Sequence, residues 1–242
     1  MRTSTLAFAA SAAITMAALA ACASNPGTQP NDMSAAQHEA MANQQAAEAR
    51  EHDAKYDPNA SADTPHRCHE GSVVNEAAPC WSSSSNPTAH NLNEAKVHRR
   101  IAAEHRAASD VLRDAEARAC TGVSDDDRDM SPFHHREDIL KVDPLTESAG
   151  PKGTPRVAGA VVFFRAVPRM TEAWLQRVVD CHIARNAALG HRVPEMAYCP
   201  LVPSHVTARV TTTSGALSVA IRSDDAVSAA EVLKRAQSLT SQ

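Results

Sequence analysis

Residues 204–223 read SHVTARVTTTSGALSVAIRS and decide the fold class of the second half of the chain. Apolar side chains alternate with polar ones before the Ser214-Gly215 turn, and the alternation resumes after it. A period of two, interrupted by a tight turn, predicts two antiparallel strands with one buried face. The predicted buried positions are Val206, Ala208, Val210, Leu217, Val219 and Ile221.

The segments around this hairpin complete a small domain. The run Ala160–Phe164 is uncharged, β-branched and aromatic, and it predicts a buried strand. A helix is predicted over 172–189, with Thr171 as its N-cap and Gly190 at its end. A final helix is predicted after a cap at Asp224 or Ser223, with Val227, Ala230, Leu233 and Ala236 on its apolar face. We also predict a short strand over 139–142 and a Pro/Gly loop over 144–159. The fold class is therefore α+β, with a small antiparallel sheet covered by two helices in a compact domain over 130–241.

The first half of the chain is Ala-rich, helical and rich in loops over 35–122. Its longest predicted helix covers 89–119 and has a weak heptad seam through His98, His105 and Leu112. Ser34 and Gln37 fit a capping box for a shorter helix ending near Lys55, which could fold back on the long one. Residues 57–88 and 121–138 are predicted to be loops, because turn residues dominate both.

The N-terminus is an export signal by its layout. Arg2 precedes an uncharged apolar run over 6–21, and Leu19-Ala20-Ala21-Cys22 closes it. This ending resembles the lipobox of bacterial lipoprotein precursors, Leu-Ala/Ser-Gly/Ala-Cys, at all four positions. The resemblance covers about the first tenth of the chain and predicts a signal peptide over 1–21. An ordinary cleaved signal with a coincidental cysteine is the alternative.

The lipobox resemblance implies lipidation of Cys22 and acylation of its new amino group. The expected location is a membrane anchor facing the periplasm, with the outer membrane favoured because Ala23, and not Asp, follows the cysteine. Several acyl chains together give stable anchoring. Residues 22–34 are small, polar and broken by prolines, so we expect them to form a lipidated flexible tether.

Composition restricts the partners. The chain has 24 basic and 28 acidic side chains, a formal net charge of −4, which argues against nucleic acid. We therefore expect a protein or another envelope component as the partner, bound without a cofactor.

Five cysteines follow Cys22, and an exported chain is expected to form disulfides. Cys68 and Cys80 are the cysteine pair nearest in sequence, and they are predicted to form a disulfide. Cys181 and Cys199 are the second predicted pair, because the chain after the 172–189 helix can return beside it. Cys120 is left as a free or intermolecular thiol. Other pairings that involve Cys120 stay open, because spacing alone cannot select among them.

Histidines offer a competing function, a periplasmic metal-binding or metal-stress lipoprotein. Cys181, His182, His191 and Cys199 have ligand chemistry suited to zinc or copper, although their spacing is not that of a zinc knuckle. His98 and His105 are two helical turns apart, too far to chelate one ion directly. A disulfide and half-buried histidines are the structural alternatives, and no metal site is assigned.

Enzyme signatures are missing from the sequence. It contains no Gly-x-Ser-x-Gly, no phosphate-binding glycine loop and no His-Glu-x-x-His. A catalytic group assembled only in space stays possible, and an enzyme of unrecognised type is the third hypothesis. The first hypothesis is a non-enzymatic envelope lipoprotein that binds a protein or another envelope component.

Overall fold

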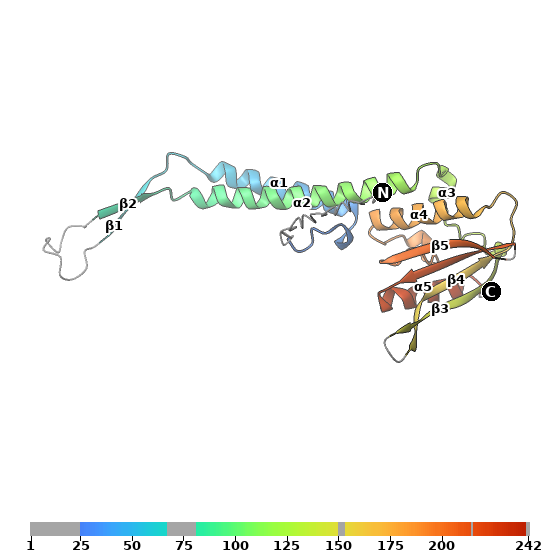
Figure 1. Cartoon of the computed structure of the whole chain (residues 1–242). Helices are drawn as coiled ribbons and strands as arrows, with labels where there is room; N and C mark the ends of the chain where they lie inside the picture. The colour runs from blue at the N-terminus through green and yellow to red at the C-terminus, as the bar shows by residue number, and fades with distance from the viewer. Residues whose placement is uncertain (1–24, 67–80, 150–152, 214, 241–242) are drawn as a thin grey trace, which may run out of the picture.

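The computed structural model describes residues 25–66, 81–149, 153–213 and 215–240. A long helical hairpin projects from a more compact α+β part (Figure 1). The helices are α1 (Ala35–Lys55), α2 (Ala89–Ala119), α3 (Asp125–Asp129), α4 (Glu172–Ala188) and α5 (Ala226–Ser238), with short 3-10 turns η1 (Pro30–Asp32), η2 (Arg136–Asp138) and η3 (Pro194–Met196). The strands are β1 (Ala62–His66), β2 (Trp81–Ser85), β3 (Ile139–Ala149), β4 (Thr154–Phe164), β5 (Val206–Thr213) and β6 (Ala216–Ser223).

The α+β prediction is confirmed. Four antiparallel strands form one sheet in the order β3-β4-β6-β5. Alternate residues of β4 and β6 face one core, as Val162 opposite Val219 illustrates. Both α4 and α5 pack on this face, since Leu175 and Val179 from α4 and Val232 and Ala236 from α5 share its core. The sheet is thus covered by two helices on one side.

The predicted loop over 144–159 is wrong, because β3 and β4 extend through most of it. Pro144 pairs with Ala160, and Pro155 pairs with Ser148. The first proline is tolerated because β3 is an edge strand, where one side of the backbone needs no ladder partner. Register shifts interrupt the β3–β4 pairing, one of them between Leu145 and Thr146.

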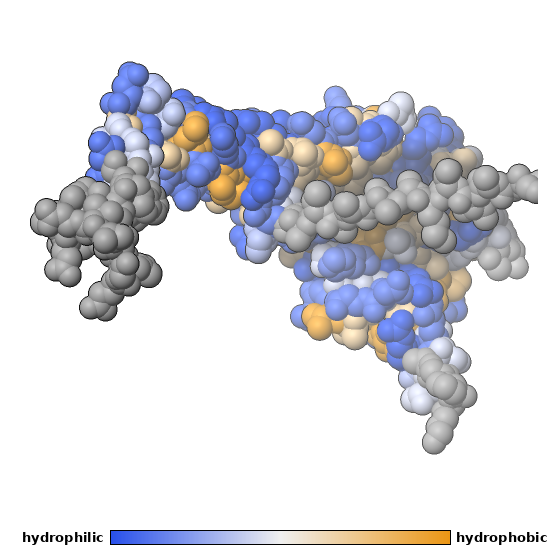
Figure 2. Space-filling model, turned by 60° about the vertical axis from the view of Figure 1, so that its left-hand side comes forward, coloured by the Kyte–Doolittle hydropathy of each residue, from blue (hydrophilic) through white to orange (hydrophobic). Residues whose placement is uncertain are grey.

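The hairpin consists of α1 and α2, packed antiparallel along a seam of small residues. Ala42, Ala49, Ala95 and Ala102 are buried there. The predicted capping box at Ser34 and Gln37 is present, with the Gln37 amide donating to Ser34 Oγ (3.2 Å). The outer surface of the hairpin is mostly hydrophilic (Figure 2), so its helices depend on the seam for burial. At the far end, β1 and β2 pair as an antiparallel ribbon within the predicted loop.

The long helix α2 has two partners placed end to end. Along most of its length it packs on α1, and near its C-terminus it packs on α4 (Figure 1). Leu112 of α2 contacts the start of α1 at Ala35 and the end of α4 at Ala188 in one apolar cluster. Gly190 lies at the junction with φ +67°, and a Cβ there would come within 3.0 Å of Ser34. Glycine therefore lets the two helix ends meet.

Residues 25–33 lie against α2, where the sequence predicts a free tether. Asn25 Nδ2 donates to Glu104 Oε2 (2.8 Å), and the Thr28 side chain is buried. Pro30 begins the 3-10 turn η1, and Met33 leads into the cap of α1. Composition could not predict this placement, because the acceptor lies 79 residues away in the sequence. The signal peptide and Cys22 lie outside the described residues.

Candidate functional site

The α+β part contains a cavity with a volume of about 750 Å³. It lies where α3, the segment after it, the end of β4 and the beginning of α4 meet. This volume is in the range of small-molecule and side-chain binding sites. Its lining includes Asp126, Asp127, Met130, Ser131, Pro132, His135, Asp138, Phe164, Val167, Pro168, Arg169, Met170, Trp174, Leu175 and Val178.

The floor of the cavity is apolar. Phe164 at the end of β4 and Leu175 and Val178 in α4 are fully buried beneath it. Met170 and Trp174 are half-buried, and Met130 at the mouth is 44% exposed. The aromatic and sulfur-containing side chains provide large, adaptable contact surfaces.

Local sequence explains why Trp174 lies at this cavity. Pro168 follows the end of β4, and Arg169 takes φ 72° in the connection to α4. Thr171 then caps α4, its hydroxyl accepting the Trp174 N–H (3.2 Å). The capped first turn places Trp174 on the side of α4 that faces α3 and the β4 end. A positive φ at a residue with a side chain is uncommon and often accompanies functional loops.

The rim is charged. Asp126 and Asp127 come from the first turn of α3, where carboxylates are favoured by the helix dipole. Arg165 Nε donates a hydrogen bond to Asp138 Oδ1 (2.7 Å). Nδ1 of His135 lies 3.1 Å from Oε1 of Glu137. The pocket therefore combines an apolar interior with polar groups at its opening.

A buried histidine fixes the α3 wall of this pocket. His182 Nε2 lies 2.9 Å from the carbonyl of Asp127 and 3.0 Å from that of Met130. Both partners are acceptors, so Nε2 carries the proton and donates to them. Burial lowers the pKa of His182, which therefore stays neutral. The histidine that the sequence offers as a metal ligand is instead a hydrogen-bond donor to the pocket wall.

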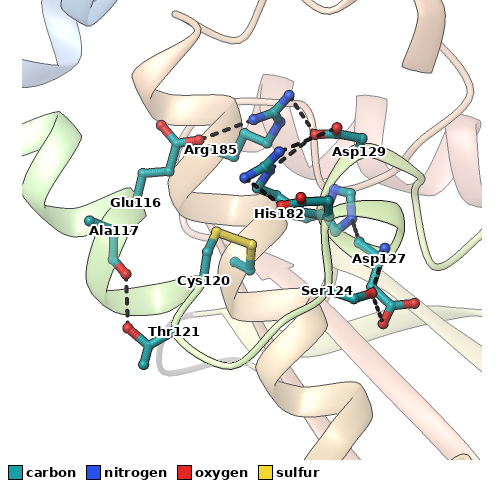
Figure 3. Close-up of a disulfide and its surroundings, with 12 residues drawn as sticks. Glu116, Ala117, Cys120, Thr121, Ser124, Asp127, Asp129, His182 and Arg185 are labelled. Atoms are coloured by element: carbon teal, nitrogen blue, oxygen red, sulfur yellow. Dashed lines mark hydrogen bonds and ion pairs between the residues drawn. A yellow bond between two sulfur atoms is a disulfide. The ribbon is translucent and has the colours of Figure 1, made fainter.

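A disulfide and an ion-pair network hold the same region to the hairpin (Figure 3). Cys120, just after α2, is bonded to Cys181 of α4. One turn further along α4, Arg185 pairs with Glu116 (3.2 Å) and with Asp129 (3.0 Å). The end of α2, α3 and α4 therefore form one connected wall beside the pocket.

The predicted Cys181–Cys199 disulfide is wrong, and so is the prediction of a free Cys120. Cys199 is a buried free thiol in the sheet core, and its burial raises the pKa of the thiol. Leu175 and Val179 face that core, whereas Cys181 is two residues further and about 200° away around α4. Cys181 therefore faces α2. Cys68 and Cys80 lie outside the described residues, so their predicted bond is untested.

The histidines suggested as ligands are dispersed. His191 Nδ1 bonds the Val202 carbonyl (2.8 Å), and burial lowers the pKa of its ring. His98 contacts α1 through Gln45 (2.7 Å), and His105 contacts His38 (3.0 Å). Within residues 25–66, 81–149, 153–213 and 215–240, no group of three or more histidine, cysteine or carboxylate side chains could hold a metal ion.

Sequence reasoning missed the pocket and also Met170 as part of it. Trp174 lies within the helix predicted over 172–189 and is half-buried at this pocket. The available signal was a concentration of large side chains around Pro168, with Val167, Met170 and Trp174 within eight positions. Met130 joins them only in space, across the chain reversal after α3.

Comparison with known proteins places this chain in no family. No family model matches it, and neither a curated protein nor a solved structure does. In the part of the chain that the structure describes, none of the helices has the length and apolar character needed to span a bilayer.

Proposed function

We propose that this chain is a non-enzymatic bacterial envelope lipoprotein, anchored through Cys22, that binds an apolar side chain of another envelope protein. The observation that carries the binding part is the pocket of about 750 Å³ between α3 and α4. The lipobox resemblance supports the anchor.

The chemistry of the pocket favours binding of an apolar group. Its interior offers Phe164, Met170, Trp174 and Leu175, which gain by excluding water from an apolar ligand. Aromatic residues in such pockets commonly dominate the affinity of a protein interface. The charged rim suits a partner whose apolar side chain is surrounded by polar groups.

A neutral apolar dye tests the pocket. We expect N-phenyl-1-naphthylamine to bind the mature chain carrying Cys22→Ser with micromolar affinity and increased dye fluorescence. Trp174→Ala should weaken the affinity at least about tenfold, because it removes an aromatic wall of the site. Met170→Glu should weaken it as well, since it introduces a carboxylate.

The matched control is Val227→Ala, which shortens an apolar side chain that is 78% exposed on α5. Its dye affinity should equal that of the parent protein. Circular dichroism checks that each variant is folded. Equal affinities in all four proteins would show that the dye binds elsewhere and would remove the basis of the proposed binding function.

The anchor is tested separately. In cells, Cys22→Ser should abolish acylation and leave the protein as an unprocessed precursor or in the soluble fraction. Ala23→Asp is the control, because it keeps the cysteine and should keep the lipid while shifting the protein to the inner membrane. Fractionation and mass spectrometry of the N-terminal peptide measure both results. Membrane attachment of the Cys22→Ser protein at its normal mature size would contradict the anchor.

A further inference from the structure

Three polar layers cross the seam between α1 and α2 at heptad spacing. His38, Gln45 and His52 follow one another every seven residues on α1, and Asn91, His98 and His105 do so on α2. The antiparallel pairing is His52 with Asn91 (3.1 Å), Gln45 with His98 (2.7 Å) and His38 with His105 (3.0 Å). Buried alanines separate these layers, so the helices approach closely throughout.

The His38–His105 layer differs from the others because both partners are titratable rings. Their Nδ1 atoms are 3.0 Å apart and both side chains are buried. One Nδ1 must carry a proton and the other must accept it. Nε2 of His38 is buried without a hydrogen-bond partner among the residues that the structure describes. The favoured arrangement therefore keeps that nitrogen unprotonated and places the shared proton on Nδ1 of His38.

A second proton has no favourable position in this layer. On His38 Nε2 it would be a buried donor without an acceptor, and on His105 Nδ1 it would place two donors against each other. The next layer lacks this problem, because His98 has the Glu48 carboxylate at 3.0 Å as well as Gln45. Acid therefore acts selectively on the His38–His105 layer.

Nearby carboxylates make a second proton on the folded His38–His105 layer less unfavourable, but they do not remove the penalty. Burial lowers the pKa of His105, and the neighbouring His38 lowers it further. Two carboxylates act in the opposite direction, because Glu104 on α2 and Asp32 on η1 raise the pKa of His105. The pKa of His105 is lowered on balance, so the unfolded segment binds a proton more readily than the folded one.

The same layer adjoins the contacts that hold residues 25–33. Glu104, next to His105 in sequence, accepts from Asn25 (2.8 Å). One turn along α2 from His105, Ser109 Oγ donates to the Ala35 carbonyl at the start of α1 (3.0 Å). Opening the layer would therefore release both the beginning of α1 and the segment before it.

We propose that the His38–His105 layer is an acid-sensitive latch that holds α1 and residues 25–33 on α2 at neutral pH and opens more readily below about pH 6.5. The sign follows from linkage. Above pH 6.5 neither state holds the additional proton and stability is constant. As the pH falls through 6.5 only the open state takes it up, so opening becomes more favourable until the folded ring also titrates.

Hydrogen exchange of the full mature chain tests the latch. At pH 5.0, amides of α1 should open more often than at pH 7.0, by up to about 30-fold for each proton taken up on opening, after correction for the intrinsic exchange rate. His38→Gln should abolish most of this increase, because the glutamine Oε1 can accept from a protonated His105 Nδ1, as Gln45 Oε1 accepts from His98 Nδ1 one heptad away. His90→Gln, at an exposed position of α2, is the matched control and should respond like the parent protein.

An acid response of His38→Gln equal to that of the parent would overturn the latch. If His38→Gln does not fold at pH 7.0, side-chain NMR of the unmodified protein decides the question. The His105 ring should then stay neutral until α1 loses protection. Protonation of His105 near pH 6.5 with α1 still protected would overturn the proposal.

Discussion

Replacing both Cys120 and Cys181 by serine is expected to lower the free energy of unfolding by about 4 kcal/mol. The bond closes a loop of 61 residues, so it restricts the unfolded chain strongly. In the folded chain it joins α2 to α4 beside the pocket, and Arg185 pairs with Glu116 and Asp129 in the same place. Arg185 and Glu116 are half-buried and Asp129 is exposed. Ion pairs that are this open to water contribute little, so they should not compensate for the lost bond.

Urea unfolding followed by circular dichroism measures this loss. Changing both cysteines avoids leaving a reactive partner thiol. Cys199→Ala is the matched control, since it removes a buried cysteine that forms no disulfide, and it should cost less. Non-reducing peptide mapping of the unmodified protein should link Cys120 to Cys181. A peptide joining Cys181 to Cys199 would contradict the structure.

Gly159→Ala is expected to destabilise the sheet by at least about 3 kcal/mol. Gly159 has φ +147°, and a Cβ there would lie 2.0 Å from the Ile221 carbonyl oxygen of β6. The obstacle is backbone in the centre of the sheet, because Gly159 is paired with Arg222 on one side and Leu145 on the other. The β4–β6 pairing would have to separate locally to admit a methyl group.

Gly153→Ala is the control for Gly159→Ala, and chemical denaturation measures both. Gly153 also has a positive φ, +64°, but a Cβ there would meet no atom within 4 Å. Gly153→Ala should therefore lower the free energy of unfolding only by the cost of a positive φ at a residue with a side chain, about 1–2 kcal/mol. Similar losses at the two positions would indicate that the β4–β6 contact is looser than the structure describes.

Strand and helix positions could be predicted because their signals are local. Residues 204–223 alternate in polarity around a Gly turn, and β5 and β6 occupy these positions. The predicted long helix over 89–119 matches α2, whose sequence maintains helix-forming residues for its full length. The loop predicted over 144–159 failed, because Pro144 lies on an edge strand and its effect on pairing depends on which side has a neighbour.

The pocket and the latch could not be predicted from the sequence. Met130 and Trp174 belong to segments with no shared periodicity, and only the packing of α3 beside α4 brings them to one cavity. His105 was recognised as a seam residue, but its partner His38 is 67 positions away in an Ala-rich helix with almost no apolar stripe. The alignment of two such helices along each other is set by all the residue layers of their contact together, and no single residue fixes it.

The sequence by itself determined α1, α2, α4 and α5, the β5–β6 hairpin, the capping box at Ser34, the α+β class and the resemblance of the N-terminus to a lipoprotein signal. Each of these depends on residues within a few turns of one another. Only the tertiary structure decided the partner of Cys120, the placement of Asn25 on Glu104 and the enclosure of the pocket by α3. The first two depend on which faces meet across 61 and 79 residues of chain, and the third depends on the packing of α3 beside α4. The physical reason is that packing against distant elements sets the direction in which each side chain leaves its helix. That direction selects one partner among several that the sequence alone leaves possible.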